Sequence, residues 1–302
     1  MKQSEENNLK IQSMAISRNK IELFKDRLET EGFSFTGHES NRFLKWRAKR
    51  DGLTINVYNT GKIVLQGKGI ESFLADTDIW SGLMESQNDS EDLVGIDEAG
   101  KGDYFGPLVV AAVLVRSRQW NELAMKGIRD SKSMSDAQVL RLSSEIKKAC
   151  PHSLVVISPE RYNNLYQKIK NLNRLLAWGH ARALENILNH WEVSRALSDQ
   201  FGDKSLLLSA LMEKGKSIQL MQTPKAEKNL AVAAASILAR NEFLTRLSAL
   251  GETYGTVFPK GAGSQVVQAG RRFFKEHGSE DLARVAKIHF KTTREVRALQ
   301  IG

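Results

Sequence analysis

The sequence has little of several features that define large protein classes. Its 302 residues include a single cysteine, Cys150, which excludes an internal disulfide and any metal site built from several cysteines. No run approaches the ~18 apolar residues of a membrane span, and the polar start, residues 1–10, has no apolar signal region. We therefore expect a cytoplasmic protein that does not bind membranes, with Cys150 as a small buried side chain.

Acidic residues are also fewer than basic ones. The chain has 44 Lys and Arg against 35 Asp and Glu, a formal net charge of +9. Such an excess favours a polyanionic partner, because Lys and Arg neutralise phosphates and release counterions. A solvated basic surface is the alternative that charge alone leaves open. The length gives room for two domains.

Residues 1–81 predict a small α+β domain. Within a predicted helix, 16–28, the apolar residues Ile21, Phe24 and Leu28 recur at helical spacing. Three predicted strands follow, joined by turns that contain glycine, at 43–48, 53–58 and 62–66. The sequence therefore predicts a helix followed by a three-stranded meander.

Positive charge is concentrated on this meander. Residues 42–68 carry seven Lys and Arg against one acid, Asp51, whereas residues 1–90 as a whole sum to zero. We interpret one sheet face as packed on the helix and the other as a basic nucleic-acid platform, with Trp46 or Tyr58 available for stacking or packing. A merely solvated sheet face is the alternative. The candidate contacts are Lys45, Arg47 and Lys49.

A polar and acidic stretch, 82–92, is a predicted linker, and a second domain occupies 93–302. Its predicted strands are 93–97, 108–116, 153–157, 195–198 and 217–221. Its predicted helices are 135–149, 172–189, 230–250 and 280–298. Strands interspersed with helices indicate an α/β fold layered around one sheet.

The most informative stretch is 94–102, where an apolar strand ends in two adjacent carboxylates. Asp97 and Glu98 form an oxygen-rich group that suits Mg²⁺ or Mn²⁺. The Gly-Lys-Gly turn that follows offers free backbone N–H groups and a lysine, which suit a phosphate. Together these features indicate metal-assisted chemistry on a phosphodiester.

A metal site needs further oxygen ligands from elsewhere in the chain. Asp199 ends a short predicted strand, and it would lie beside Asp97 if the two strands are neighbours, ~4.8 Å apart. A turn-forming aspartate is the alternative for this residue. For a fourth acid, periodicity does not choose among Glu227, Glu242 and Asp130. Glu227 also fits the first turn of a helix, where a carboxylate complements the helix dipole.

These motifs resemble those of type 2 ribonucleases H, and among these enzymes they are most similar to those of ribonuclease HIII. They occur along the chain in the same order as in that family. The matching segments include Gly-Ile-Asp-Glu-Ala-Gly-Lys-Gly at 95–102, Asp-Ser-Lys at 130–132, Asp-Gln-Phe at 199–201, Lys-Ala-Glu at 225–227 and Lys-Ile-His-Phe at 287–290. The resemblance implies a ribonuclease H-like catalytic domain with a mixed sheet flanked by helices. It also implies an N-terminal domain, similar to a TATA-box-binding-protein repeat, that helps to hold the substrate.

The resemblance also assigns roles to individual residues. Its four-acid pattern of catalytic and metal-binding residues falls here on Asp97, Glu98, Asp199 and Glu227. It implies that the 2′-hydroxyl of RNA is recognised by the backbone of Gly100, Lys101 and Gly102. We expect Lys132 to contact a phosphate.

The implied activity is hydrolysis of the RNA strand of an RNA/DNA hybrid, which leaves 5′-phosphate and 3′-hydroxyl ends. Two divalent ions, Mg²⁺ or Mn²⁺, would lie ~4 Å apart, bridged by Asp97 and the scissile phosphate. Clustered carboxylates repel one another, so we expect a raised pKa at one of them before metal binds. The tyrosine that type 2 enzymes use at a lone ribonucleotide has no clear counterpart here, so we expect a preference for RNA tracts. We expect a monomer.

Two rival hypotheses stay open at this point. One is another enzyme of the ribonuclease H-like superfamily, such as a DNA endonuclease or resolvase, which would cut DNA that holds no ribonucleotide. The other is a hybrid-binding module with a vestigial site, which would bind hybrid and release no product. An assay for metal-dependent cleavage separates the three hypotheses.

Overall fold

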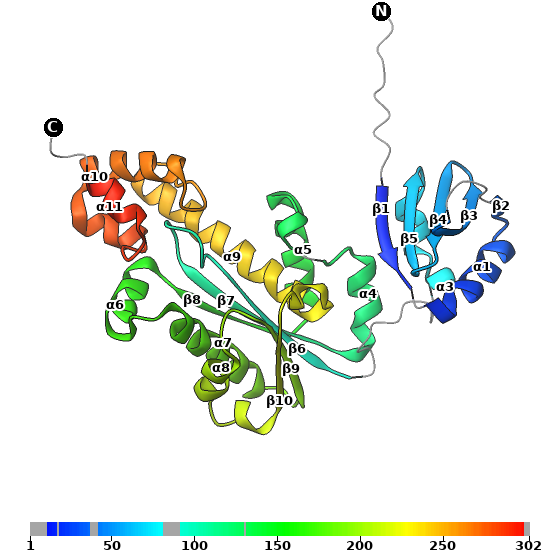
Figure 1. Cartoon of the computed structure of the whole chain (residues 1–302), viewed down its shortest axis with the longest axis horizontal. Coiled ribbons are helices and arrows are strands. Elements are labelled where there is room, and N and C mark those ends of the chain that lie inside the picture. Colours follow the sequence, from blue (N-terminus) through cyan, green and yellow to red (C-terminus); the bar gives the residue numbers. More distant parts are fainter. Residues whose placement is uncertain (1–10, 17, 37–41, 81–90, 130, 299–302) are drawn as a thin grey trace, which may run out of the picture. The chain divides into compact units, whose positions relative to one another are not determined.

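A computed structural model describes residues 11–16, 18–36, 42–80, 91–129 and 131–298 of the chain. It divides the protein into two compact units, residues 1–89 and 90–302, and we describe each by itself (Figure 1). The predicted linker lies largely outside the described residues, as does Asp130. None of the described helices combines the length and the apolar character that crossing a membrane requires.

The first unit is a five-stranded antiparallel sheet with helices. Its strands, in the order β1-β5-β4-β3-β2, are β1 Ile11–Ala15, β5 Lys62–Gly67, β4 Leu53–Tyr58, β3 Leu44–Arg50 and β2 Ser34–Thr36. The helices are α1 Ile21–Thr30, α2 Ile70–Ala75 and α3 Thr77–Trp80. The expected α+β unit is confirmed, and the three predicted strands are its centre. The expectation of three strands was wrong, because the short outer strands β1 and β2 add to both edges.

The two faces of this sheet differ. Ile21, Phe24 and Leu28 of α1 are buried against one face, as their spacing predicts. Trp46 of β3 is only 7% exposed and lies against Phe24, with the ring centroids 5.7 Å apart. It therefore packs in the core and is not available to stack on a base. Along β3 the exposure alternates, which leaves Arg47 and Lys49 on the other face.

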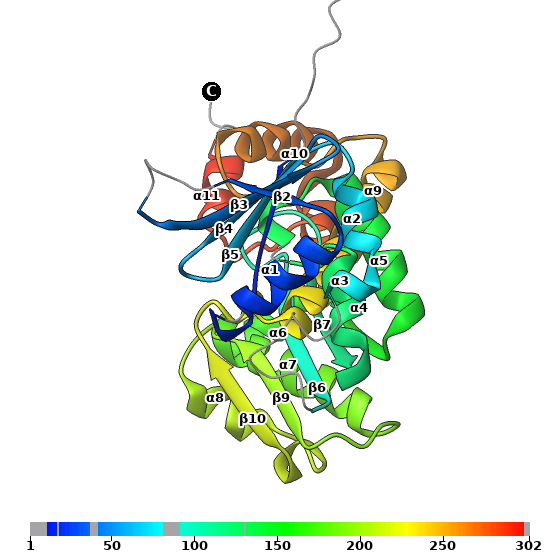
Figure 2. The ribbon, with the colours of Figure 1, turned by 90° about the vertical axis from the view of Figure 1, so that its right-hand side faces the viewer.

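The second unit is built on a five-stranded mixed sheet, ordered β10-β9-β6-β7-β8 (Figure 2). Its strands are β6 Leu93–Ala99, β7 Leu108–Val115, β8 His152–Ile157, β9 Arg195–Asp199 and β10 Gln219–Thr223. β6, β7 and β8 pair antiparallel, whereas β9 and β10 run parallel to β6. Every residue of β7 is buried, as expected of a strand covered on both faces.

Helices cover both faces of this sheet, as expected for a ribonuclease H-like α/β layer (Figure 1). One face carries α9 Leu230–Tyr254, α5 Asp136–Ala149 and α4 Trp120–Met125; the other carries α7 Leu172–Leu188, with α6 Pro159–Ile169 and α8 Lys204–Ala210 beside it. The alanine-rich start of α9 crosses β6 at Gly95, where an added Cβ would lie 2.0 Å from the Ala231 carbonyl carbon. Small residues on both elements therefore set how close α9 lies to β6.

The C-terminal helical material is interrupted. The structure has α10 Ser264–Val285 and α11 Thr292–Arg297, so the predicted helical segment 280–298 is helical at both ends and interrupted between them. At the break, the extended residue Ala286 forms a β-bridge with Phe105, just before β7. This break brings the C-terminal segment to the turn between β6 and β7.

Candidate active site

Two of the four predicted acids meet at the ends of neighbouring strands. β6 and β9 pair in parallel with Ile96 opposite Ser198, so the next residues along, Asp97 and Asp199, lie side by side. This confirms the strand neighbourhood that the sequence left conditional. Since the carboxyl ends of parallel strands meet at one edge, β10 adds Thr223 opposite Asp199 and leads the chain toward Glu227.

Asp97 faces α9. Its carboxylate accepts a hydrogen bond from Ser236 of that helix, and another from the Glu98 backbone N–H at 2.8 Å. Burial, together with the charges of Glu98 and Asp199, raises the pKa of Asp97 to about 8. A raised pKa was predicted for one acid of the cluster; Asp97 has one, and so does Asp199.

Glu98 faces the opposite side of the sheet, toward α7. Its carboxylate is 3.0 Å from His180 Nε2 and 3.4 Å from Lys101 Nζ. Burial alone would raise the pKa of Glu98, but the hydrogen bond from His180 and the charges of His180 and Lys101 lower it overall. The adjacent acids of β6 are thus held in different environments, one toward each helix layer.

Asp199 and Glu227 are joined through a backbone amide. Asp199 Oδ1 accepts a hydrogen bond from the Ala226 N–H at 2.9 Å. Glu227 follows in a 3₁₀ turn, Ala226–Lys228, that precedes α9, so it is not a first-turn residue of that helix. Burial and the charges of Glu227 and Glu98 raise the pKa of Asp199. The four acids therefore act on one another electrostatically.

The donor set suits a divalent cation, although the acids are paired with other groups. Within the described ranges, no three His, Cys, Asp or Glu side chains converge on a point where they would hold one ion. Glu98 instead turns toward His180 and Lys101, and Glu227 toward Lys132, which relieves repulsion between carboxylates. Glu227 keeps its Oε2 buried without a hydrogen-bond partner. An orphaned carboxylate oxygen beside other carboxylates is what a hard cation would satisfy.

The Gly-Lys-Gly turn lies directly after these acids. Gly100 has φ +85°, and an added Cβ would lie 2.1 Å from the Pro107 carbonyl oxygen, so the fold itself requires glycine there. At Gly102 an added Cβ would meet nothing within 4 Å. Lys101 is 39% exposed while its amine stays near Glu98. The turn therefore presents open backbone beside the acids.

A buried lysine fastens the loop that continues from this turn. Lys287 is fully buried and donates from Nζ to the carbonyl oxygens of Asp103 at 2.8 Å and Gly106 at 2.7 Å. Burial lowers the pKa of Lys287 to about 7. Gly261 adds a bond from its N–H to the Asp103 carboxylate at 2.6 Å, and its carbonyl accepts from Tyr104 N–H. The loop is thus held by residues far along the chain.

Lys132 lies beside the fourth acid. Its amine is 3.7 Å from Glu227 Oε1, and the side chain is 73% exposed. The preceding residue, Ser131, is buried, and its hydroxyl is 2.9 Å from that of Ser236, the residue that hydrogen-bonds Asp97. The segment that contains Lys132 therefore contacts Glu227 directly and contacts Ser236, the hydrogen-bond partner of Asp97.

The three basic residues predicted as nucleic-acid contacts belong to the other unit. Arg47 Nε donates to Asn56 Oδ1 at 2.6 Å on the exposed sheet face. Lys49 is exposed on the same face. Lys45, in contrast, pairs with Glu22 of α1 at 2.6 Å, so its charge is directed toward the helix.

Sequence reasoning missed the residues that hold the acids in place. His180 of α7 is fully buried and links Glu98 to the Ser198 hydroxyl, 3.0 Å from its Nδ1. Ser236 stands out only as the polar residue that ends a run of alanines. Lys287 gave no local signal, because its partners lie 181 and 184 residues away.

Known proteins share both the sequence and this architecture. The sequence profile of the family described as Ribonuclease HII matches residues 94–293. A ribonuclease HIII of Protochlamydia amoebophila is 41% identical and covers 89% of this chain and 91% of its own length. A ribonuclease HIII of Chlamydia felis is 38% identical, with 91% and 93% covered. The crystal structure of Bst-RNase HIII in complex with Mn²⁺ matches with a TM-score of 0.68 and 28% identity, covering 96% of this chain and 99% of that one.

Proposed function

Because this chain belongs to the ribonuclease HII/HIII family of metal-dependent endoribonucleases, we propose that it hydrolyses the RNA strand of RNA/DNA hybrids and leaves 5′-phosphate and 3′-hydroxyl ends. The single observation that carries this proposal is a series of four carboxylates at one sheet edge, in which each acid acts electrostatically on at least one of the others. They are Asp97, Glu98, Asp199 and Glu227. Water would be the attacking group, activated by the metal that these acids hold.

The same four acids would hold the metal, Mg²⁺ or Mn²⁺. The Mn²⁺ complex of Bst-RNase HIII supports a divalent ion, and the unpaired Glu227 Oε2 supports an oxygen-ligated one. Two bound ions would supply a hydroxide-like water and neutralise the charge on the leaving 3′ oxygen. Asp97, with its raised pKa, would release its proton when it becomes a ligand.

Selection of RNA rests on the turn 100–102. Only the 2′-hydroxyl distinguishes the strands chemically at a given site. The open space at Gly102 supports close approach of a sugar to the backbone there. Lys101 and Lys132 are placed to add phosphate contacts, since both are exposed beside the acids. We extend the proposal to a preference for RNA tracts over single ribonucleotides.

The unit that contains the basic sheet face would add affinity. We propose residues 1–81 as a substrate-binding domain, 82–92 as a linker and 93–302 as the catalytic domain of a monomer. The exposed face with Arg47 and Lys49 supports this role, because phosphate contacts distributed over a sheet bind without sequence preference. Lys45 would have to exchange Glu22 for a phosphate to take part.

Replacement of Asp97 by Asn tests the proposal. Cleavage of a hybrid in Mg²⁺ or Mn²⁺ should fall on the order of 10³-fold, the scale of losing a preorganised charge-stabilising group, while hybrid binding in EDTA stays within about twofold. If the wild-type protein binds hybrid and releases no product in either metal, it is a binding module. If it cuts DNA that holds no ribonucleotide, it is a different nuclease of this fold.

A further inference from the structure

One short turn contacts both halves of the acid cluster. Ser131–Ser133 is a single 3₁₀ turn that leads to α5. Ser131 reaches the Ser236 hydroxyl at 2.9 Å, and Ser236 hydrogen-bonds Asp97. The neighbouring Lys132 amine lies 3.7 Å from Glu227. The position of this turn therefore affects a partner of Asp97 and a partner of Glu227 together.

The turn is a short segment that leads into α5. Its Ser131 carbonyl accepts a backbone hydrogen bond from the Met134 N–H at 3.1 Å. The Lys132 side chain is 73% exposed. Side chains of other elements that bind such a segment contribute to its position.

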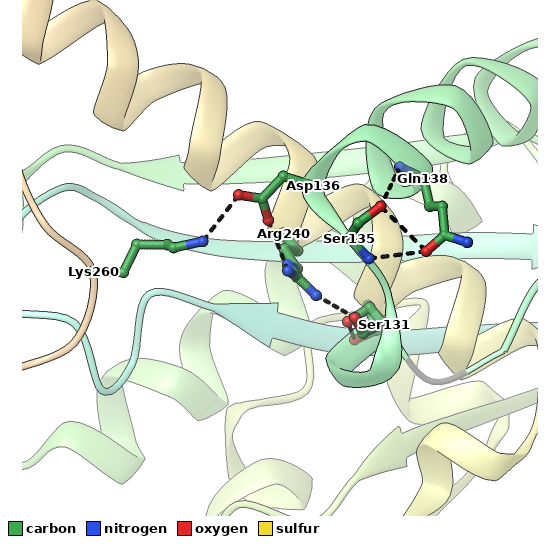
Figure 3. A network of polar contacts seen from close by, with 7 residues as sticks. Ser131, Ser135, Asp136, Gln138, Arg240 and Lys260 are labelled. Atoms are coloured by element: carbon green, nitrogen blue, oxygen red, sulfur yellow. Dashed lines mark hydrogen bonds and ion pairs between the residues drawn. The ribbon is translucent and has the colours of Figure 1, made fainter. Parts of the chain in front are cut away.

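Arg240 of α9 binds this turn with a charged side chain (Figure 3). One guanidinium nitrogen donates to the Ser131 carbonyl oxygen, and the other donates to Asp136 Oδ1 at 2.7 Å. Asp136 also accepts from Lys260 Nζ at 3.0 Å. A planar guanidinium can serve both acceptors at once, which a single ammonium does less well.

Both ends of this link are anchored independently of the turn. Asp136 is the first residue of α5, whose start is fixed by a capping box between Ser135 and Gln138 (Figure 3). Arg240 belongs to the part of α9 that packs on the sheet. The guanidinium therefore links α9 to α5 and, from this fixed place, donates a hydrogen bond to the Ser131 carbonyl.

We infer that Arg240 is a positioning residue for the turn Ser131–Ser133, holding Lys132 where it meets a substrate phosphate beside Glu227 and holding Ser131 against Ser236. The inference rests on the proposed function, because the phosphate contact of Lys132 belongs to it. Arg240 acts through the turn: its guanidinium binds the Ser131 carbonyl and Asp136, neither of which is one of the four acids.

A double-mutant cycle between Arg240 and Lys132 tests this inference. Hybrid binding is measured in EDTA over a range of salt, so that no readout depends on bound metal. Arg240→Met should weaken binding several-fold and lower the salt slope by about 0.9, the loss of one phosphate contact. Lys132→Met should do the same. The double variant should match either single variant, because both remove the same contact.

Two further variants keep the test decisive. Arg246→Met is the matched control, since Arg246 lies on the same helix and pairs with Glu242 at 2.8 Å without touching the turn; it should leave the Lys132→Met effect unchanged. If Arg240→Met does not fold, the cycle is run with Arg240→Lys. This variant keeps the positive charge but replaces the planar guanidinium that donates to both acceptors at once. Additive losses in the double variant, or wild-type binding by Arg240→Met, would overturn the inference. Absence of hybrid cleavage by the wild-type protein would instead overturn the proposed function.

Discussion

The protein contains two five-stranded sheets that bear their polar groups in different places. The antiparallel sheet of the first unit leaves one face open, and its polar side chains are spread over that face. The mixed sheet of the second unit is covered by helices on both faces, and its acids gather at strand ends. A sheet buried on both faces can present polar groups together only at its edge, where strands and turns end.

The difference separates two kinds of chemistry. Acids at a strand end share one partly desolvated space, so their charges raise the pKa of Asp97 and of Asp199. Cations spread over an open face act almost independently, because solvent and salt screen them from one another. We therefore expect substitutions at the strand-end cluster to affect the chemical step, and substitutions on the open face to affect only affinity.

The largest expected effect distinguishes Glu227 from another glutamate of equal exposure. Glu227 and Glu242 are each 14% exposed, and each pairs with one basic side chain. Glu227→Gln should lower kcat for hybrid on the order of 10²-fold, because it removes a charge from the cluster. Glu242→Gln should leave kcat within about twofold. Equal losses in the two variants would show that Glu227 has no special role.

A second prediction concerns stability and pH without metal. The pKa of Asp97 is raised from 3.8 to about 8 in the folded protein. The folded state therefore holds a proton that the unfolded state loses between these values, so stability falls as pH rises from about 4 to 8. Asp97→Asn removes this loss, and it should melt about 3 °C or more above wild type at pH 8.5 in EDTA. At pH 4 the two should melt together.

Thermal melting of both proteins across this pH range is the measurement. A difference in melting temperature between the two proteins that stays constant with pH would contradict the raised pKa of Asp97. A gap that closes on adding Mn²⁺ to the wild-type protein would sharpen the comparison, because a bound cation relieves the same repulsion.

The smallest expected effect belongs to the open face. Lys49→Gln should lower the salt slope of hybrid binding by about 0.9 and leave kcat at saturating hybrid unchanged. Lys25→Gln, on α1 and paired with Glu29 at 3.5 Å, is the control and should change neither value. A fall in kcat, or equal slopes in both variants, would break the distinction between the two sheets.

Local signals in the sequence predicted the frame of both units. Asp51 and Gly52 take φ values of +47° and +81°, as a tight hairpin turn requires. Ser135 and Gln138 form a capping box at the start of α5, close to where the sequence predicts that this helix begins. Gly95 and the alanines of α9 meet as small residues do at close crossings. Each of these depends on a few neighbouring residues or on a size pattern, which a sequence displays directly.

The parts that were not predicted depend on distant partners. The edge strands β1 and β2 are defined by pairing with β5 and β3, which lie elsewhere in the chain. The break at Ala286 is set by pairing with Phe105. The contacts of His180 and Arg240 with the site join segments 82 and 109 residues apart. The acids themselves could be proposed from strand ends and from the family resemblance, whereas the side chains that hold them required the fold.

The most direct test is a cleavage assay of the wild-type protein in Mg²⁺ and in Mn²⁺. Three duplexes of one sequence are compared: an RNA/DNA hybrid, a DNA duplex with a single ribonucleotide and plain DNA. We predict cuts within the RNA of the hybrid that leave 5′-phosphate and 3′-hydroxyl ends, much slower cutting at the single ribonucleotide, and intact plain DNA. Cleavage of plain DNA, or binding of the hybrid without any product in either metal, would contradict the account.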